Sequence, residues 1–227
     1  MMPRFLAALC ALLLVAAAPT ALACGWGGEN DGDDDDEAIV IGADGKPVVE
    51  AVADPAALTI LGNRQRARHD LVAAVSSYRQ AAELGHAPAQ NNLATMYEQG
   101  LGLLRDDAQA AAWFRRAAEA GFAPAQHSLA MMLRDGRGAE RDAGQAARWL
   151  RRAAAGGHHS AFVDLGALYW AGEGVAKDPV EALACWTVAG EAGAAAAEEP
   201  RRRALAALTA AQISAAKKRA RVLRTTE

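Results

Sequence analysis

The chain has 227 residues, of which 52% are hydrophobic but only 5% aromatic, and alanine is the dominant apolar residue. This composition excludes a mostly disordered chain and favours closely packed helices over large β-sandwiches or barrels. Three cysteines exclude a disulfide-rich scaffold. The net charge of −3 hides three zones: one base and no acid in residues 1–23, ten acids against one lysine in 24–54, and a basic excess in 55–227.

Residues 1–23 have the pattern of a secretory signal peptide. Arg4 precedes an apolar run of about 14 residues, and Ala21-Leu22-Ala23 has the small-x-small form of a cleavage site. The run is shorter than the roughly 20 residues that cross a bilayer, and a buried N-terminal helix is the alternative. We therefore expect an exported protein, periplasmic or secreted, whose mature chain begins at Cys24.

A cysteine at the first mature position is typical of bacterial lipoprotein processing, so Cys24 is a candidate lipidation site. Such sites usually carry leucine three residues before the cysteine, whereas this chain has Ala21 there. Two outcomes stay open at this point. One is a membrane-anchored lipoprotein; the other is simple cleavage, after which Cys24 and Cys185 could pair in an oxidising compartment.

Residues 24–55 are predicted to form a flexible acidic arm. The run Asn30–Glu37 has the charge density of a cation binder, but it lacks the glycine and glutamate that an EF-hand loop requires. A solvated charge run is the simpler interpretation. Asp44-Gly45 between two short β-branched runs is a hairpin signal. Residues 56–69 are predicted to be a linker or a leading helix.

A period of 36 residues runs through the chain from Asp70 onward. Three kinds of position recur in step, namely aspartates, Ala-Ala-x-x-Gly blocks and Gly-x-Gly motifs: Asp70, Asp106, Asp142 and Asp178; Gly85, Gly121, Gly157 and Gly193; Gly100, Gly136 and Gly172, each followed by x-Gly. Each unit predicts two helices, because the aspartate can cap the first and the block glycine can end it. The units are 70–105, 106–141, 142–177 and a partial 178–199. A single helix pair cannot bury its apolar face, so we expect the units to stack.

The segment Trp113–Gln126, followed by Leu129, Gly136-Arg137-Gly138 and Asp142, resembles the Sel-one-like repeat family, a relative of the tetratricopeptide repeats. The resemblance covers roughly residues 70–223. It implies an all-α fold, a right-handed α/α superhelix of helix–turn–helix repeats. It also implies a protein-interaction scaffold, mostly without catalysis of its own.

Residues 200–227 are predicted to form one C-terminal capping helix. Ile213, Ala216, Ala220 and Leu223 fall on one helical face, and basic residues occupy the rest. The alternative is a basic amphipathic helix that lies on an anionic membrane. The thin apolar stripe, without Trp or Phe, favours the cap.

Five arginines occupy two neighbouring repeat positions and are the candidate partner-binding residues: Arg79, Arg115, Arg116, Arg151 and Arg152. On successive helices they would form a ladder of guanidinium groups able to bind a carboxylate-rich peptide or an anionic glycan. The alternative is that a basic residue is simply favourable near a helix C-terminus. In a third interpretation, the acidic arm folds onto this ladder or onto residues 201–224, and salt releases it.

No pattern in the sequence predicts catalysis, a cofactor or a metal site. His86 and His158 share a repeat position with Phe122, which indicates packing rather than metal ligation. Ser214 and Lys217 have the Ser-x-x-Lys spacing of penicillin-recognising enzymes, but the companion motifs are missing. The Gly-x-Gly motifs lack the third glycine of a dinucleotide loop.

We therefore expect a non-catalytic protein–protein interaction scaffold of the bacterial envelope or secreted space, with a protein or peptide partner in the solenoid groove. The alternative is a lipid-anchored envelope module that binds an anionic glycan or a cell-wall polymer. A nucleic acid is not an expected ligand, because an exported protein rarely meets one. Contact with a membrane is expected only through a lipid on Cys24.

Overall fold

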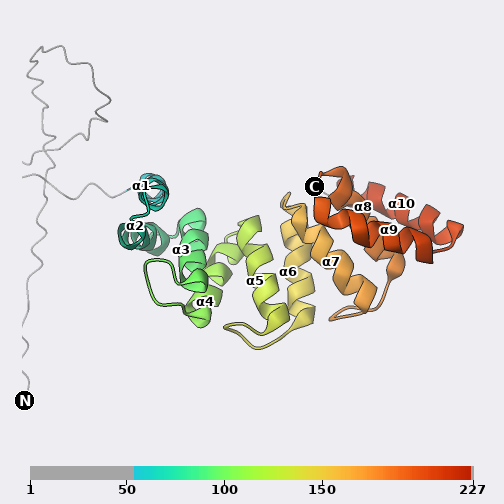
Figure 1. Ribbon diagram of the computed structural model, residues 1–227, viewed down its shortest axis with the longest axis horizontal. Coiled ribbons are helices and arrows are strands. Elements are labelled where there is room, and N and C mark those ends of the chain that lie inside the picture. Colours follow the sequence, from blue (N-terminus) through green and yellow to red (C-terminus); the bar gives the residue numbers. More distant parts are fainter. Residues whose placement is uncertain (1–53, 226–227) are drawn as a thin grey trace, which may run out of the picture. The chain divides into compact units, whose positions relative to one another are not determined.

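The computed structural model describes residues 54–225, whose secondary structure is entirely helical. Figure 1 shows the helices following one another in chain order, with α9 and α10 beside α8. The helices are α1 (Pro55–Ala67), α2 (Leu71–Glu83), α3 (Ala87–Gln99), α4 (Asp107–Glu119), α5 (Ala123–Asp135), α6 (Ala143–Ala155), α7 (Ser160–Ala171), α8 (Pro179–Glu191), the short 3₁₀ helix η1 (Ala195–Ala197), α9 (Glu198–Ala207) and α10 (Ala210–Thr225). The predicted signal peptide, Cys24, the acidic run and the hairpin signal lie outside the described residues.

The helices pack as successive pairs, which makes the fold the predicted all-α solenoid of helix–turn–helix repeats. The most extensive contacts join α1 with α2, α3 with α4, α5 with α6, and α7 with α8. The units predicted from the aspartates instead combine α2 with α3, α4 with α5, and α6 with α7, and these contacts are less extensive. Each pair with extensive contacts therefore begins one helix before the corresponding predicted unit. Helices α7 and α8 form the fourth pair. Helix α1 occupies the predicted linker or leading helix and begins at Pro55, inside the range predicted for the acidic arm.

The aspartate N-caps predicted from the period are confirmed. The carboxylates of Asp106 and Asp142 accept hydrogen bonds from the amides three residues later, at 2.9 and 2.7 Å. Asp70 accepts a similar bond, and Asp178 accepts from two first-turn amides. Asp54 caps α1 in the same way. Each carboxylate therefore satisfies backbone donors that the first turn of a helix leaves unpaired.

The Gly-x-Gly turns pack directly onto a neighbouring helix. Gly138 has a φ of +66°, and a Cβ added there would lie only 1.9 Å from the carbonyl oxygen of Asp107 in the first turn of α4. At Gly121, which ends α4, φ is +87° but nothing lies within 4 Å of such a Cβ. Gly138 is thus required for both conformation and space, whereas Gly121 is required for conformation alone.

The core is built mainly from alanine, with a few large side chains in each pair. The alanines of the Ala-Ala-x-x-Gly blocks are at most 2% exposed, and the large fully buried side chains include Tyr78, Phe114, Leu129, Met132 and Leu150. Small side chains let the helix backbones approach closely, so the few large residues suffice to fill the remaining space.

The C-terminal region differs from the single capping helix predicted for residues 200–227. Two helices, α9 and α10, occupy it, and the backbone is extended at Leu208 between them. The break between α9 and α10 has a local cause. Thr209 and Gln212 form a reciprocal capping box, in which each side chain accepts a hydrogen bond from the other residue's backbone amide, and this starts a new helix.

The apolar stripe predicted for this region does face the core. Ala216 and Ala220 of α10 are 0% and 1% exposed, and Ile213 and Leu223 pack partly against the same core. Most contacts of α10 are with α8. An ion pair of 2.7 Å between Arg219 and Glu181 also joins these two helices.

Candidate functional site

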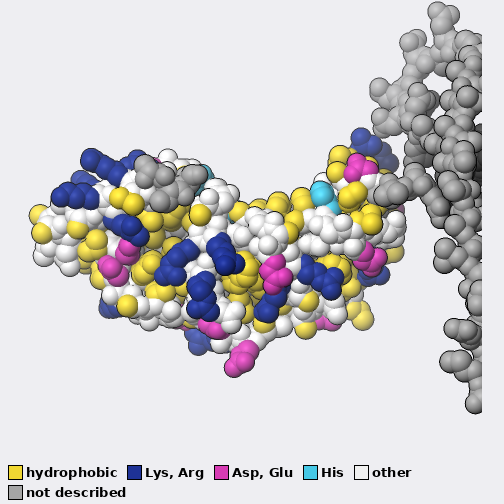
Figure 2. Space-filling view, turned by 180° about the vertical axis from the view of Figure 1, so that it is seen from behind, with side chains coloured by type: hydrophobic (Ala, Val, Ile, Leu, Met, Phe, Trp, Pro, Cys, Tyr) yellow, Lys and Arg dark blue, Asp and Glu magenta, His cyan; other side chains and the backbone are white. Residues whose placement is uncertain are grey.

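The five candidate arginines lie on α2, α4 and α6 and are all exposed. Arg79 belongs to α2, Arg115 and Arg116 belong to α4, and Arg151 and Arg152 belong to α6. Figure 2 shows Lys and Arg side chains gathered over the middle of one face, with apolar surface and several acidic side chains between and around them. The individual arginines nevertheless have different surroundings.

Arg116 and Arg152 are stacked on tryptophans of their own helices. Their guanidinium carbons lie 4.4 and 4.8 Å from the ring centroids of Trp113 and Trp149, three residues earlier. A cation over an aromatic face is attracted by the ring quadrupole. The stacking thus holds these two guanidinium groups against half-buried rings, so they form part of the surface of the repeat.

Arg79 and Arg151 are held by tyrosines of the following helix. Arg151 donates two hydrogen bonds to the Tyr169 hydroxyl, at 2.9 and 3.3 Å, and lies 5.6 Å from the ring centroid. Arg79 donates one bond of 3.3 Å to the Tyr97 hydroxyl. These bonds orient both arginines and join α2 to α3 and α6 to α7.

Arg115 differs from the other four candidates. The repeat position that holds Tyr97 and Tyr169 holds Leu133 in the unit of Arg115, and Leu133 is buried in the core. Among the described residues, Arg115 has no hydrogen-bonding or ionic partner. The predicted ladder is therefore not uniform. The alternation of Tyr97, Leu133 and Tyr169 at one repeat position was the sequence signal for this difference.

A groove recurs beside Arg115 and Arg151. The first has a volume of about 350 Å³ and the second about 580 Å³. Five lining positions correspond in the two grooves: Ala108, Ala112, Arg115, Gly138 and Ala139 in the first, and Gly144, Arg148, Arg151, Gly174 and Val175 in the second. Each groove therefore sets an arginine of one helix beside the Gly-x-Gly turn that packs on it.

The chemistry of these grooves suits an anionic peptide. A guanidinium can bind a carboxylate through two parallel hydrogen bonds. Small exposed residues such as Ala108 and Ala112 leave room for a peptide backbone to approach the helix surface. Arg115 is available for such a contact as it stands, whereas Arg151 is already oriented by Tyr169.

The histidines take part in packing and hydrogen bonding. His86 Nδ1 lies 2.7 Å from the Thr59 hydroxyl, and the rings of His127 and His158 lie 4.9 Å apart. Burial, and then the nearby His127, lowers the pKa of His158 below its usual value. Within residues 54–225, no group of three or more His, Cys, Asp or Glu side chains is arranged to hold a metal ion.

Cys185 lies in the core of α8 and is 1% exposed. Burial raises the pKa of its thiol to about 12. The thiolate, which is the reactive form, is therefore scarce at neutral pH. A disulfide from Cys185 to any other cysteine would require α8 to move out of the core.

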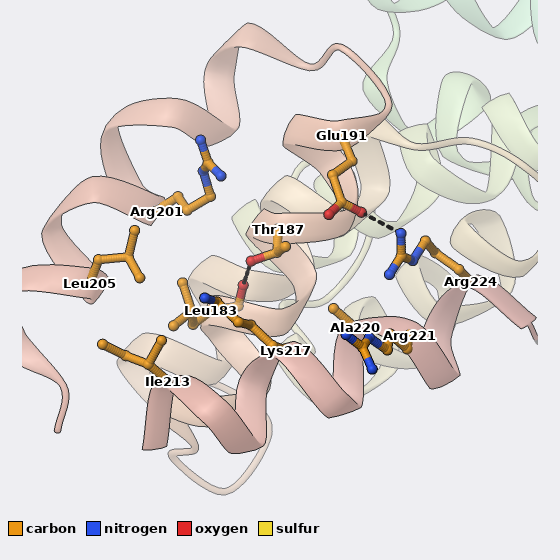
Figure 3. A pocket seen from close by; sticks show the side chains of 10 residues that line it. All are labelled: Leu183, Thr187, Glu191, Arg201, Leu205, Ile213, Lys217, Ala220, Arg221 and Arg224. Atoms are coloured by element: carbon orange, nitrogen blue, oxygen red, sulfur yellow. Dashed lines mark hydrogen bonds and ion pairs between the residues drawn. The ribbon is translucent and has the colours of Figure 1, made fainter. Parts of the chain in front are cut away.

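A cavity of about 390 Å³ lies among α8, α9 and α10, and sequence reasoning missed it (Figure 3). Its lining combines aliphatic and basic side chains: Leu183, Thr187, Glu191, Arg201, Leu205, Ile213, Lys217, Ala220, Arg221 and Arg224. The only sequence signal was the run 201–224, with eight bases and no acid. The cavity itself depends on the break between α9 and α10.

The comparisons with known proteins agree with the observed repeats. The Sel1 repeat model matches residues 63–86, 87–122, 123–158 and 163–193. The second and third matches span α3–α4 and α5–α6, the pairs with extensive contacts in the structure. No curated protein matches the chain. Within residues 54–225, every helix is too short or too polar to cross a membrane.

Two solved structures are similar to this chain. A Sel1 repeat protein from Oxalobacter formigenes is 30% identical, with a TM-score of 0.64, over 74% of this chain and 70% of that one. The protein c5321, a protective antigen of uropathogenic Escherichia coli with an SLR fold, is 27% identical, with a TM-score of 0.54. That match covers 76% of this chain but only 46% of c5321, so the alignment spans less than half of that protein.

Proposed function

Because this chain belongs to the Sel1 repeat family, whose members generally serve as protein-interaction scaffolds, we propose that it is an exported, non-catalytic scaffold of the bacterial envelope or secreted space. Its grooves beside Arg115 and Arg151 bind an acidic segment of a partner protein. The observation that carries this proposal is Arg115, an exposed guanidinium without a partner among the described residues. It lies in a groove lined mainly by alanine and glycine, with Arg116 and Glu119 as the other charged residues.

Export is proposed from the signal-peptide pattern of residues 1–23. The mass of the mature N-terminus tests it. A chain that begins at Cys24 without modification supports a soluble exported scaffold, and a lipid on Cys24 supports a membrane-anchored form. A chain that retains residues 1–23 contradicts both.

The grooves are tested by crosslinking capture from envelope extracts. We expect Arg115→Ala/Arg151→Ala to lower the recovery of the captured protein by about tenfold, because each lost bidentate contact contributes on the order of 1 kcal/mol. The matched control is Arg202→Ala/Arg203→Ala, which removes two exposed arginines of α9 outside these grooves. Equal recovery with both variants contradicts the proposed site. Glycan binding without any captured protein supports the alternative, an envelope module for an anionic polymer.

In this proposal, the chain's own acidic arm, residues 24–55, competes with the partner's acidic segment for the same grooves. Deleting residues 25–53 keeps the Asp54 cap of α1 and removes nine acidic side chains. We expect the deletion to strengthen partner binding at low salt and to have little effect at high salt, because salt screens exposed charges. No change at any ionic strength would exclude the competition.

A further inference from the structure

The cavity at the C-terminal end has an aliphatic floor and a basic rim. Leu183 and Ala220 form buried parts of the floor, and Leu205 is 40% exposed at its edge. Figure 3 shows these side chains lying between α9 and α10, with the basic side chains around them. The four basic residues of the lining face a single acidic residue, Glu191.

Two of the four basic residues already have acidic partners. Arg224 pairs with Glu191 at 2.9 Å, and Arg201 pairs with Glu198 at 2.8 Å. Lys217 and Arg221 have no ionic partner among the described residues. Within residues 54–225, the rim therefore presents two positive charges without an ionic partner, beside the partly exposed Leu205.

We propose that this cavity binds a short acidic segment of a partner protein, in which an aliphatic side chain lies between two carboxylates. The aliphatic side chain would cover Leu205 and the floor, and the carboxylates would pair with Lys217 and Arg221. This site is separate from the grooves on α4 and α6 and does not depend on them.

The spacing of the two cations matches an extended peptide. Lys217 and Arg221 are four residues apart on α10, which corresponds to a rise of about 6 Å. Side chains at positions i and i+2 of an extended segment are about 6.6 Å apart. An acidic–aliphatic–acidic segment can therefore place one carboxylate near each cation.

The surroundings also give the site a direction. Beside Arg201 and Leu205, a neighbouring hollow is lined by Glu198, Glu199 and two arginines. Each of these arginines pairs with one of the glutamates, so this side offers no uncompensated cation among the described residues. The acidic side chains of the ligand would thus lie toward α10. A membrane surface is disfavoured as the ligand, because the apolar stripe of α10 is already packed against the core.

The test uses the full mature chain and a fluorescein-labelled peptide with the sequence GSEELEESG. We expect Lys217→Ala/Arg221→Ala to raise its dissociation constant by about tenfold, as expected for two exposed charge pairs. The control Lys218→Ala/Arg68→Ala removes two exposed charges outside the cavity and should change affinity less than about twofold. Replacing the peptide's Leu by Ser should weaken binding at least about tenfold, because the aliphatic contact is lost.

Several results would overturn the proposal. These are the absence of peptide binding, an equal loss with both double variants, or no effect of the Leu replacement. Tighter peptide binding after Asp31, Asp33–Asp36 and Glu37 are neutralised would make the chain's own acidic segment the occupant. Anionic phospholipid vesicles that bind through Lys217 and Arg221 while the peptide does not would make a membrane the ligand. Circular dichroism of each variant distinguishes loss of the site from loss of the fold.

Discussion

The middle repeats and the C-terminal cap both pack helices through small residues, but their basic side chains have different surroundings. In α2, α4 and α6, four of the five candidate arginines contact a Trp or a Tyr. The helices α9 and α10 contain no aromatic residue, and Lys217 and Arg221, which line the cavity, have no ionic partner among the described residues. The comparison shows that arginines at one repeat position have the same contacts only where the neighbouring Trp or Tyr is also repeated.

The largest expected effect concerns the Gly-x-Gly turn, which is present in the repeats and absent from α9 and α10. Gly138→Ala should lower the free energy of unfolding by about 3 kcal/mol or more, because the added methyl meets backbone of α4 and φ is positive. Gly121→Ala, with the same kind of φ but open space, should cost about 1 kcal/mol. Urea unfolding of the two variants measures both values. Similar losses would show that the turn does not pack on α4 as described.

A smaller effect is expected where the cap docks on the repeats. Ala216 of α10 is 0% exposed and packs in the core, whereas Ala215 of the same helix is exposed. Ala216→Leu should destabilise the cap by about 1–3 kcal/mol, because Ala216 is enclosed by core side chains and does not line the cavity. Ala215→Leu should be nearly neutral. Amide hydrogen exchange should show the loss of protection in α10 and not in α3–α6.

The thiol of Cys185 gives an independent measure of this docking. It is buried in α8, and its electrostatic neighbours include Arg219 of α10. In a Cys24→Ser background of the mature chain, a thiol reagent should modify Cys185 slowly, and faster in Ala216→Leu. Fast modification without any substitution would contradict a tightly docked cap.

The smallest expected effect is the pH dependence of the repeats. His158 faces His127, His159 and Asp164, and its pKa is lowered mainly by burial. The unfolded chain therefore binds this proton more readily, so stability is lost as the pH falls from above the ordinary histidine pKa through the lowered one. His158→Phe introduces the residue found at the same repeat position, Phe122. We expect its Tm to fall less between pH 7.5 and 5.5, whereas an unchanged fall would exclude this histidine as the cause.

Local structure was the part of the fold that sequence reasoning predicted well. Asp142 and its equivalents cap helices because the interaction involves only residues three positions apart. Gly121 ends a helix for a similarly local reason. The division of the helices into pairs was harder to predict from the sequence, because it depends on which neighbour each helix contacts most. The capping box of Thr209 and Gln212 was present in the sequence but was not used to predict the break before α10.

The candidate site was predicted in part. The sequence placed five arginines at equivalent positions, and the structure does place them on equivalent helices. It could not show that Arg115 has no partner among the described residues, since this depends on whether residue 133 can reach it from the next helix. Nor could it show the cavity near Lys217 and Arg221, whose walls come from three helices.

The period of 36, the caps of the repeat helices and the alanine-rich core follow from the sequence alone, since caps, turns and helical faces depend on residues close in the chain. The pairing of the helices, and the lack of an ionic partner for some basic side chains within residues 54–225, became clear only from the three-dimensional arrangement. The physical reason is that pairing and ion contacts depend on distances between helices, and a side chain is neutralised only by a group that the fold brings within reach.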